Sequence, residues 1–250
     1  MSLKKHPFGW RRRIGLSSPT VIEMISYDFY RLAPAGVDLC AVTSNIEFWD
    51  KDHFTRSLDA VLESAAYLAS RNVDFILHCG MPLVTTRGKG FEDELVRQIT
   101  EKTGLGATTS IRSAIRGLRH IGIRNVAIAS PYPQELHQSA VTFLGESGFN
   151  VVAHGSLDVP FKALQDASPE QIYAHARRVV KNASATVEGI YIPCNQWAAA
   201  DAVPLIEADL GIPVVTGAHA DFWEAFRSVG LRDVIEGHGV LMRSLADMPR

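Results

Sequence analysis

The chain has 250 residues, of which 46% are hydrophobic and 21% are charged, and its formal net charge is −2 at pH 7. This length is sufficient for a full hydrophobic core in one large domain or two smaller ones, and the composition is that of an ordinary globular protein. The small net charge excludes a general attraction to nucleic acid or anionic lipid, so we expect no nucleic-acid partner and no membrane partner.

The start of the chain shows neither the apolar segment of a signal peptide nor a membrane anchor. Its basic residues are typical of a solvated tail: Lys4, Lys5, Arg11, Arg12 and Arg13. No apolar run in the sequence reaches the length of a membrane span. The three cysteines are odd in number and widely spaced, which does not fit a disulfide framework. These features predict a cytoplasmic protein.

In chain order, apolar runs alternate with helical periodicities. Short apolar runs bounded by turn residues predict strands at 13–16, 37–43, 74–80, 104–110, 125–130, 149–154, 189–193 and 210–216. Apolar spacing and capping signals predict helices at 17–32, 50–70, 91–103, 111–120, 133–146, 168–181, 198–210 and 219–228. The segment 81–90 lacks the spacing of a phosphate-binding loop, so we interpret it as a plain connector.

The two halves of the chain repeat one pattern, which is a strand, a helix, a glycine-led strand and a closing helix. Strands that alternate with helices predict parallel sheets flanked by helices. We therefore expect an α/β fold with two pseudo-symmetric lobes, each built on a four-stranded parallel sheet, and an active site in the cleft between them. The predicted first lobe is residues 1–115, with the C-terminal segment 217–250 packed back on it. The second lobe is 116–216.

A cysteine at the end of a predicted strand is the main candidate for chemistry. Cys194 lies six residues after Glu188, and the same count from Asp74 in the first half reaches Gly80. Because side chains alternate along a strand, the neighbouring Cys79 is expected to point away from the equivalent spot. An isolated cysteine is more often a small buried hydrophobe, but this one precedes a turn and a predicted helix whose N–H groups favour negative charge. The pattern predicts one thiol facing one bare glycine.

Several segments, in this order and spacing, carry a resemblance to a known family: Arg13–Leu16 with Pro19, Arg87-Gly88, Ala127–Tyr132, Gly189–Cys194, Gly211–Val215 and Asp221–Trp223. They cover nearly the whole chain. The sequence resembles the aspartate/glutamate racemase superfamily, in the branch of arylmalonate decarboxylases and maleate cis–trans isomerases. The resemblance implies an enzyme that needs no cofactor and acts on a small carboxylic acid.

The resemblance also implies how the thiol is used. Racemases and isomerases of this family carry a cysteine in each half, whereas arylmalonate decarboxylase has a lone second-half cysteine that protonates the intermediate. Gly80 matches the decarboxylase arrangement, and Tyr132 matches the family's tyrosine at the lobe junction. Met81 and Pro82 depart from it, because the decarboxylase has hydroxyl residues there that bind a carboxylate. The asparagine that isomerases carry after their first strand is also missing.

Loss of CO2 or of a proton next to a carboxylate leaves an enediolate, which requires hydrogen-bond donors for the oxyanion and an acid for carbon. We expect Cys194 to be the proton donor, with donors from the backbone N–H groups of residues 80–83 and 195–197. The predicted substrate-binding residues are Pro19, Gly80, Met81, Pro82, Tyr132, Asn195 and Gln196. The histidines are scattered and no paired C-x-x-C occurs, so we expect no metal site.

Two alternatives stay open. The chain could be a maleate-type isomerase or an amino-acid or hydantoin racemase with Cys194 as nucleophile or base, or a non-enzymatic protein that binds a small acid. The oligomeric state is open, and a homo-oligomer is one of the options. Lower-ranked site candidates are His78, His219, Trp197, Phe48 and Trp49, and the strand-end hydroxyls of Thr20, Thr43, Ser44, Thr108, Thr109 and Thr216, for most of which helix capping is an equal explanation.

Overall fold

The computed structural model describes residues 7–44 and 51–247, and for residues 51–58 it describes the backbone alone. The strands are β1 (Arg12–Ser18), β2 (Val37–Thr43), β3 (Phe75–His78), β4 (Ala107–Thr109), β5 (Asn125–Ser130), β6 (Asn150–Ser156), β7 (Gly189–Ile192) and β8 (Val214–Thr216). The helices are α1 (Glu23–Leu32), α2 (Lys51–Ser70), α3 (Met81–Thr85), α4 (Phe91–Thr103), α5 (Ser110–His120), α6 (Gln134–Glu146), α7 (Pro169–Lys181), α8 (Val203–Leu210), α9 (Gly217–Ser228) and α10 (Gly239–Arg243), with 3₁₀ turns η1 (Phe161–Asp166) and η2 (Ala200–Ala202).

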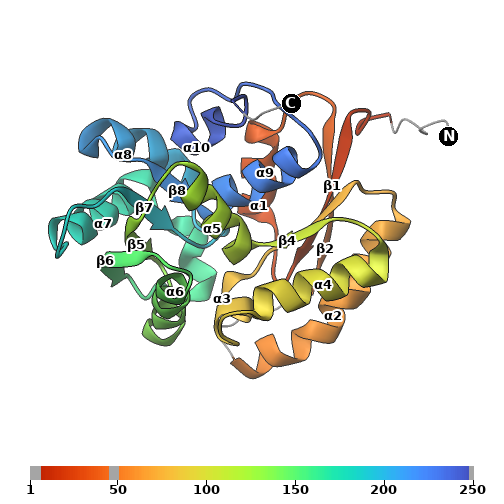
Figure 1. Cartoon of the computed structure of the whole chain (residues 1–250), viewed down its shortest axis with the longest axis horizontal. Coiled ribbons are helices and arrows are strands. Elements are labelled where there is room, and N and C mark those ends of the chain that lie inside the picture. The colour runs from red at the N-terminus through yellow and green to blue at the C-terminus, as the bar shows by residue number, and fades with distance from the viewer. Residues whose placement is uncertain (1–6, 45–50, 248–250) are drawn as a thin grey trace.

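The strands form two four-stranded parallel sheets in the described part of the chain, with the orders β2-β1-β3-β4 and β6-β5-β7-β8. In Figure 1 the first sheet lies with α2 and α4 on the right, and the second lies with α6, α7 and α8 on the left. Helices α5 and α9 lie between the sheets and contact strands of both. The predicted α/β architecture of two pseudo-symmetric lobes is confirmed.

The two halves repeat each other in detail. Asp74, before β3, accepts a hydrogen bond from the N–H of Arg13 at 2.7 Å, and Glu188, before β7, accepts one from the N–H of Asn125 at 2.8 Å. Each acid therefore fixes the start of the neighbouring strand. Counting six residues from either acid reaches the same place beyond the following strand, which is the geometric basis of the pairing that the sequence predicts.

Several predicted element boundaries were wrong. The glycine-led strands expected at 104–110 and 210–216 are shorter, at Ala107–Thr109 and Val214–Thr216. The helix expected at 17–32 begins at Glu23, because Ser17 and Ser18 are the last residues of β1. The expected connector 81–90 contains the short helix α3. The helix expected at 198–210 begins at Val203, because the chain first makes a turn in which the N–H of Trp197 bonds the carbonyl of Cys194 at 3.2 Å.

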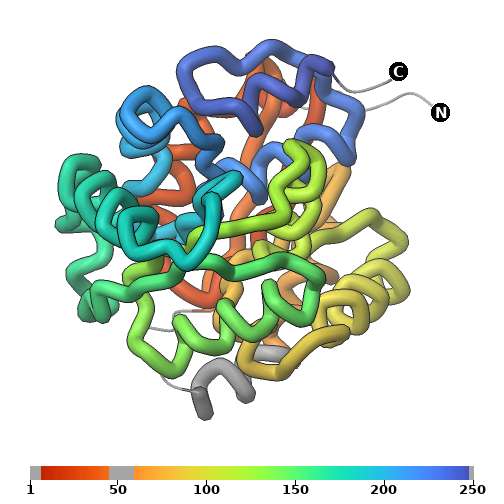
Figure 2. Tube along the Cα trace, turned by 60° about the vertical axis from the view of Figure 1, so that its left-hand side comes forward, coloured from red at the N-terminus to blue at the C-terminus, as the bar shows by residue number. Residues whose placement is uncertain are grey.

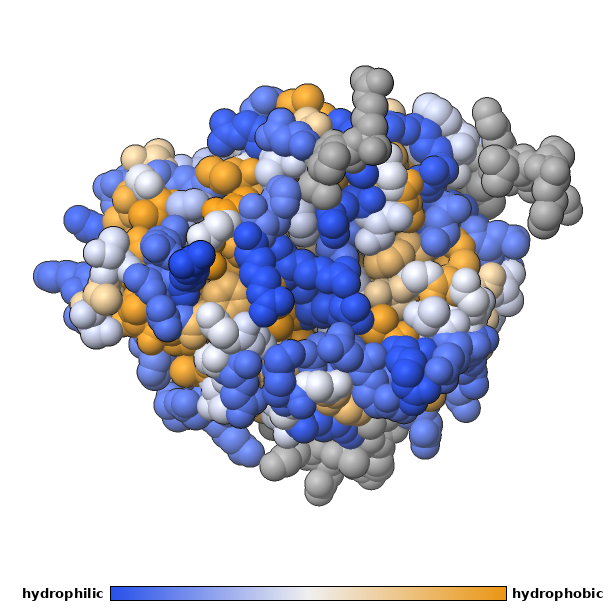
Figure 3. Space-filling view, viewed as in Figure 1, coloured by the Kyte–Doolittle hydropathy of each residue, from blue (hydrophilic) through white to orange (hydrophobic). Residues whose placement is uncertain are grey.

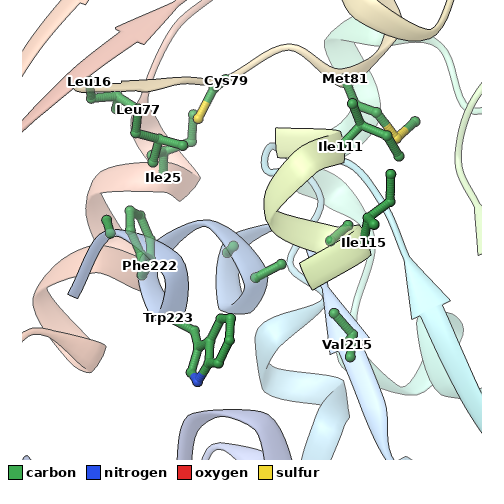
Figure 4. Packing of buried hydrophobic residues seen from close by; sticks show 14 of the residues in the cluster. Leu16, Ile25, Leu77, Cys79, Met81, Ile111, Ile115, Val215, Phe222 and Trp223 are labelled. Atoms are coloured by element: carbon green, nitrogen blue, oxygen red, sulfur yellow. The ribbon is translucent and has the colours of Figure 1, made fainter. Parts of the chain in front are cut away.

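The last helices join the two lobes. Phe222 of α9 packs edge-on against Phe29 of α1, with ring centroids 5.2 Å apart, and Glu224 pairs with Arg116 of α5. Figure 2 shows the C-terminal segment beside the N-terminal strands, with both ends of the chain on the same side. Figure 4 shows Phe222 in one buried apolar cluster with residues of the first lobe. The bounds 1–115, 116–216 and 217–250 stay a prediction.

Polar residues cover most of the face seen in Figure 3, with apolar residues in smaller patches. The basic cluster near the start is not a solvated tail where the structure describes it. Arg11 pairs with Asp233 at 2.7 Å, and Arg13 pairs with Asp38 at 3.1 Å, because these side chains flank the first strand. Lys4 and Lys5 lie outside the described residues. No helix within 7–44 and 51–247 is both long and apolar enough to cross a membrane.

Candidate active site

A cavity lies between the lobes at the carboxyl ends of β1, β3, β5 and β7. Its position is the one predicted for parallel sheets. All eight residues predicted for the site line it: Pro19, Gly80, Met81, Pro82, Tyr132, Cys194, Asn195 and Gln196. Sequence reasoning missed the lining residues Ser18, Ile25, Ser110, Phe161, Leu164 and Tyr191.

Cys194 lies half-buried in the wall of this cavity, in a backbone conformation that is unusual for it. Its φ is 83°, in the left-handed region that L-residues other than glycine rarely adopt. The N–H of Gln196 and the hydroxyl of Tyr132 hydrogen-bond its sulfur, and the N–H of Trp197 donates to its carbonyl oxygen at 3.2 Å. Donors from two β-strand ends therefore converge on one thiol.

Burial sets the protonation state of this thiol. Desolvation raises the pKa of Cys194 to about 12, although the N–H of Gln196, the hydroxyl of Tyr132 and the N–H of Trp197 all lower it. Because no helix begins within the next eight residues, the macrodipole that we expected to favour the thiolate is not at the sulfur. At neutral pH Cys194 is a thiol that carries a proton.

The facing wall is formed by the end of β3. Gly80 has a φ of 113°, so it shares the left-handed backbone of Cys194, and a Cβ placed on it would lie 3.0 Å from Cγ of Pro19. Cys79 also contributes to the lining, which the sequence argument did not anticipate, but it is only 2% exposed. Its thiol donates to Asp221 at 3.5 Å and accepts from the amide of Asn195 at 3.3 Å.

The expected oxyanion donors are only partly present. Pro82 has no N–H, and the N–H of Leu83 bonds the carbonyl of Gly80 at 3.1 Å inside α3. The N–H of Gln196 contacts the sulfur of Cys194, and the N–H of Trp197 bonds the carbonyl oxygen of Cys194 at 3.2 Å. That Pro82 cannot serve as a backbone donor was already evident from the sequence. Gly80, Met81 and Asn195 remain as backbone donors.

The rest of the cavity is neutral and largely apolar. None of the described residues that line it is a lysine or an arginine. Met81 and Pro82 supply an apolar wall, and η1 contributes Phe161 and Leu164. The hydroxyls of Ser18 and Thr20 lie at the end of β1. Neutral hydrogen-bond donors in such a cavity can bind the carboxylate of a small acid. A carboxylate that meets no donor there is destabilised, because the apolar walls do not solvate its charge.

Most lower-ranked candidates are structural. Burial lowers the pKa of His78 to about 4 and that of His219 to about 3, so both are neutral at pH 7. Thr109 caps α5 and Thr216 caps α9 through their side chains. The following side chains do not line the cavity: Thr43, Ser44, Thr108 and Trp197. Phe48 and Trp49 lie outside the described residues. Among the residues that are described, no group of three or more His, Cys, Asp or Glu side chains is placed to hold a metal ion.

Comparison with known proteins gives a consistent result. The sequence profile described as arylmalonate decarboxylase matches residues 14–242. The arylmalonate decarboxylase of Bordetella bronchiseptica is 27% identical over 224 residues, which are 87% of this chain and 90% of that protein. The maleate isomerase of Nocardia farcinica is 27% identical over 183 residues, 70% of this chain and 72% of that protein. A crystal structure of arylmalonate decarboxylase has a TM-score of 0.82 at 27% identity, over 92% of this chain and 98% of that one.

Proposed function

The chain belongs to the arylmalonate decarboxylase family, and from that premise we propose that it releases CO2 from a substituted malonate, with Cys194 as the proton donor to carbon. The observation that carries the proposal is the half-buried, protonated thiol of Cys194 in the wall of an apolar cavity, opposite a glycine. The family comparisons support a decarboxylase or isomerase that acts on a small carboxylic acid. The choice of decarboxylation over isomerisation rests on the residues that line the cavity.

The proposed reaction has two steps. The bond between the central carbon and one carboxylate breaks, CO2 leaves, and the electron pair moves into the other carboxylate to give an enediolate. The S–H bond of Cys194 then breaks as a C–H bond forms, which leaves a monocarboxylate and a thiolate. Water returns the proton to sulfur. Neither step requires an oxidant, a reductant or a cofactor.

The surroundings of the sulfur suit this sequence of events. The raised pKa keeps the proton on Cys194 until a strongly basic carbon forms beside it. The hydroxyl of Tyr132 and the N–H of Gln196 then stabilise the thiolate that the transfer produces. These two donors would activate Cys194 as a nucleophile only if its thiol were already ionised before the substrate binds.

The carboxylates of the substrate would meet different walls. The apolar side chains of Met81 and Pro82 offer no donor to a charged group, which favours loss of that charge as CO2. The retained carboxylate would be bound by neutral donors, for which the hydroxyls of Ser18 and Thr20 are available. These hydroxyls would replace the threonine and serine that the resemblance assigns to the positions of Met81 and Pro82.

Parallel assays of phenylmalonate and maleate test the proposal. We expect CO2 release from phenylmalonate with no loss of maleate absorbance, because isomerisation by two thiols lacks a cysteine at Gly80. Cys194→Ala should abolish deuterium incorporation from D2O into the product. Consumption of maleate without decarboxylation of any malonate would contradict the proposal, as would equal deuterium incorporation by the two proteins.

A further inference from the structure

Asp221 is a fully buried carboxylate that the proposed reaction does not use. It lies on α9 behind the cavity wall and is 0% exposed. One oxygen, Oδ2, accepts hydrogen bonds from the amide of Asn195 at 2.6 Å, the hydroxyl of Ser110 at 2.7 Å and the thiol of Cys79 at 3.5 Å. These three donors follow β7, β4 and β3, so one atom joins strand ends of both lobes.

This arrangement is unfavourable for the fold alone. No basic side chain in the described part of the chain pairs with Asp221, and its second oxygen, Oδ1, has no hydrogen-bond partner. Burial without a cation raises the pKa of the carboxyl to about 6, although Ser110, Asn195, Cys79 and Ser113 lower it. A buried unpaired carboxylate is costly. At the equivalent position of α5, five residues after the capping threonine, the chain has Ala114.

The partner of Asp221 stands next to the reactive thiol. Asn195 follows Cys194, whose left-handed backbone is strained and persists only when its surroundings hold it. Gly217 of α9 also permits the contact between Asp221 and Asn195, because a Cβ at position 217 would overlap Oδ1 of Asn195. Helix α9 thus leaves room for the amide and supplies the carboxylate that fixes it.

We propose that Asp221 is a positioning residue, which holds Asn195 and through it the strained backbone that aims the Cys194 thiol into the cavity. The same carboxylate directs the thiol of Cys79 away from the substrate. The inference deepens the proposed function and rests on it for the role of Cys194. Asp221 would thus determine the geometry of the site without touching the substrate.

Protonation of Asp221 should weaken the hydrogen bonds by which it holds Asn195. Hydrogen bonds to a carboxylate are about twice as strong as those to a neutral group. The titratable groups that face Asp221 are Cys79, Tyr132 and Tyr191, whose pKa values burial raises, so all three are neutral near pH 6. Activity should therefore fall as the pH drops through about 6, because only Asp221 in this group loses its charge there.

Three variants separate this role from a structural one. Asp221→Asn keeps an acceptor but has no charge to lose, and Asp221→Ala removes the acceptor. Glu224→Gln is the matched control, because Glu224 is also 0% exposed and lies one turn later on α9, with ion pairs to Arg116 and Arg227. Readouts are kcat and KM for phenylmalonate from pH 5 to 8, and the rate at which iodoacetamide labels Cys194, resolved by mass spectrometry.

We expect Asp221→Ala to lower kcat by ~10²-fold with a change in KM below about threefold, as for a misaligned catalytic group. Asp221→Asn should keep a kcat that does not vary between pH 5 and 8, near that of the wild type at pH 5. Both should change the labelling rate of Cys194. Glu224→Gln should lower the melting temperature and leave the pH profile of the wild type intact.

The proposal is overturned if Asp221→Asn keeps the acid limb of the wild type, or if Glu224→Gln shifts kcat and labelling as the Asp221 variants do. Its failure differs from failure of the proposed function. Absence of turnover by the wild type refutes the proposed function, and the labelling rates then still decide whether Asp221 positions Cys194. Equal labelling of Cys194 in the wild type and Asp221→Ala refutes the positioning role.

Discussion

Beyond β3 the chain turns through Gly80 with a φ of 113°, and beyond β7 it turns through Cys194 with a φ of 83°. The duplicated fold therefore requires a left-handed backbone at both places. Glycine adopts it without steric cost, whereas an L-residue pays roughly 1–2 kcal/mol. The first half has the residue that suits the backbone. The second half has a strained cysteine, and the proposed function accounts for that strain by the use of its thiol as the proton donor.

The ends of β1 and β5 show the same contrast. The first strand ends in Ser18-Pro19-Thr20, with Ser18 as its last residue, and its counterpart ends in Ser130-Pro131-Tyr132, with Ser130 as its last residue. Tyr132 reaches the sulfur of Cys194, whereas Thr20 is short and leaves space beside Gly80. In the proposed function, one half of the cavity therefore supplies the acid and the hydroxyl that supports it, and the other half receives the substrate.

The largest effect should come from exchanging the two thiols for hydroxyls. Cys194→Ser should lower the rate of CO2 release by 10²–10⁴-fold, the usual contribution of a positioned acid. Cys79→Ser should change it by less than about threefold, because a serine hydroxyl can still donate to Asp221. Steady-state assays of both variants decide this. Similar losses of CO2 release in Cys194→Ser and Cys79→Ser would contradict the assignment of different roles to the two strand ends.

A smaller effect is expected at the matched pair Tyr132 and Thr20. Tyr132→Phe removes one donor from the thiolate that proton transfer leaves, which should cost about 10–100-fold in kcat, since a hydrogen bond to a charged group contributes ~1.5–3 kcal/mol. Thr20→Val should act on KM rather than on kcat, because Thr20 lines the substrate side. A loss of kcat in Thr20→Val equal to that in Tyr132→Phe would contradict this division.

The smallest effect concerns backbone strain and should have opposite signs in the two halves. Gly80→Ala should lower the free energy of unfolding by ~1–2 kcal/mol, because it places a Cβ at positive φ and against Pro19. Cys194→Gly should be more stable than Cys194→Ala by about 1 kcal/mol, because glycine relieves the strain. Urea titrations of the four proteins, including the wild type, measure both differences.

Local features of the fold were accessible from the sequence. Ser168 and Pro169 mark the start of α7, where the structure has a full capping box. The pairing of Gly80 with Cys194 follows from a count along two strands, because strand geometry has a fixed period. The short helix α3 was missed because Pro82 and several glycines read as a connector, although proline is tolerated in a first helical turn.

Contacts between distant segments were not accessible. Asp221 lies 142 residues after Cys79 and 111 after Ser110, and its position in a helical segment is typical of ordinary core packing. Only the closing of two lobes around one cavity brings these residues together. For the same reason η1, with Phe161 and Leu164, could not be placed over the site from the sequence.

The burial of Cys194 also affects how its sulfur reacts with oxidants such as peroxide. Peroxide reacts with the thiolate form of cysteine and converts it to sulfenic and then to irreversible sulfinic acid. A sulfur whose pKa is raised to about 12 presents almost no thiolate at neutral pH. The burial that keeps the proton on Cys194 should therefore also slow the oxidation of its sulfur by peroxide.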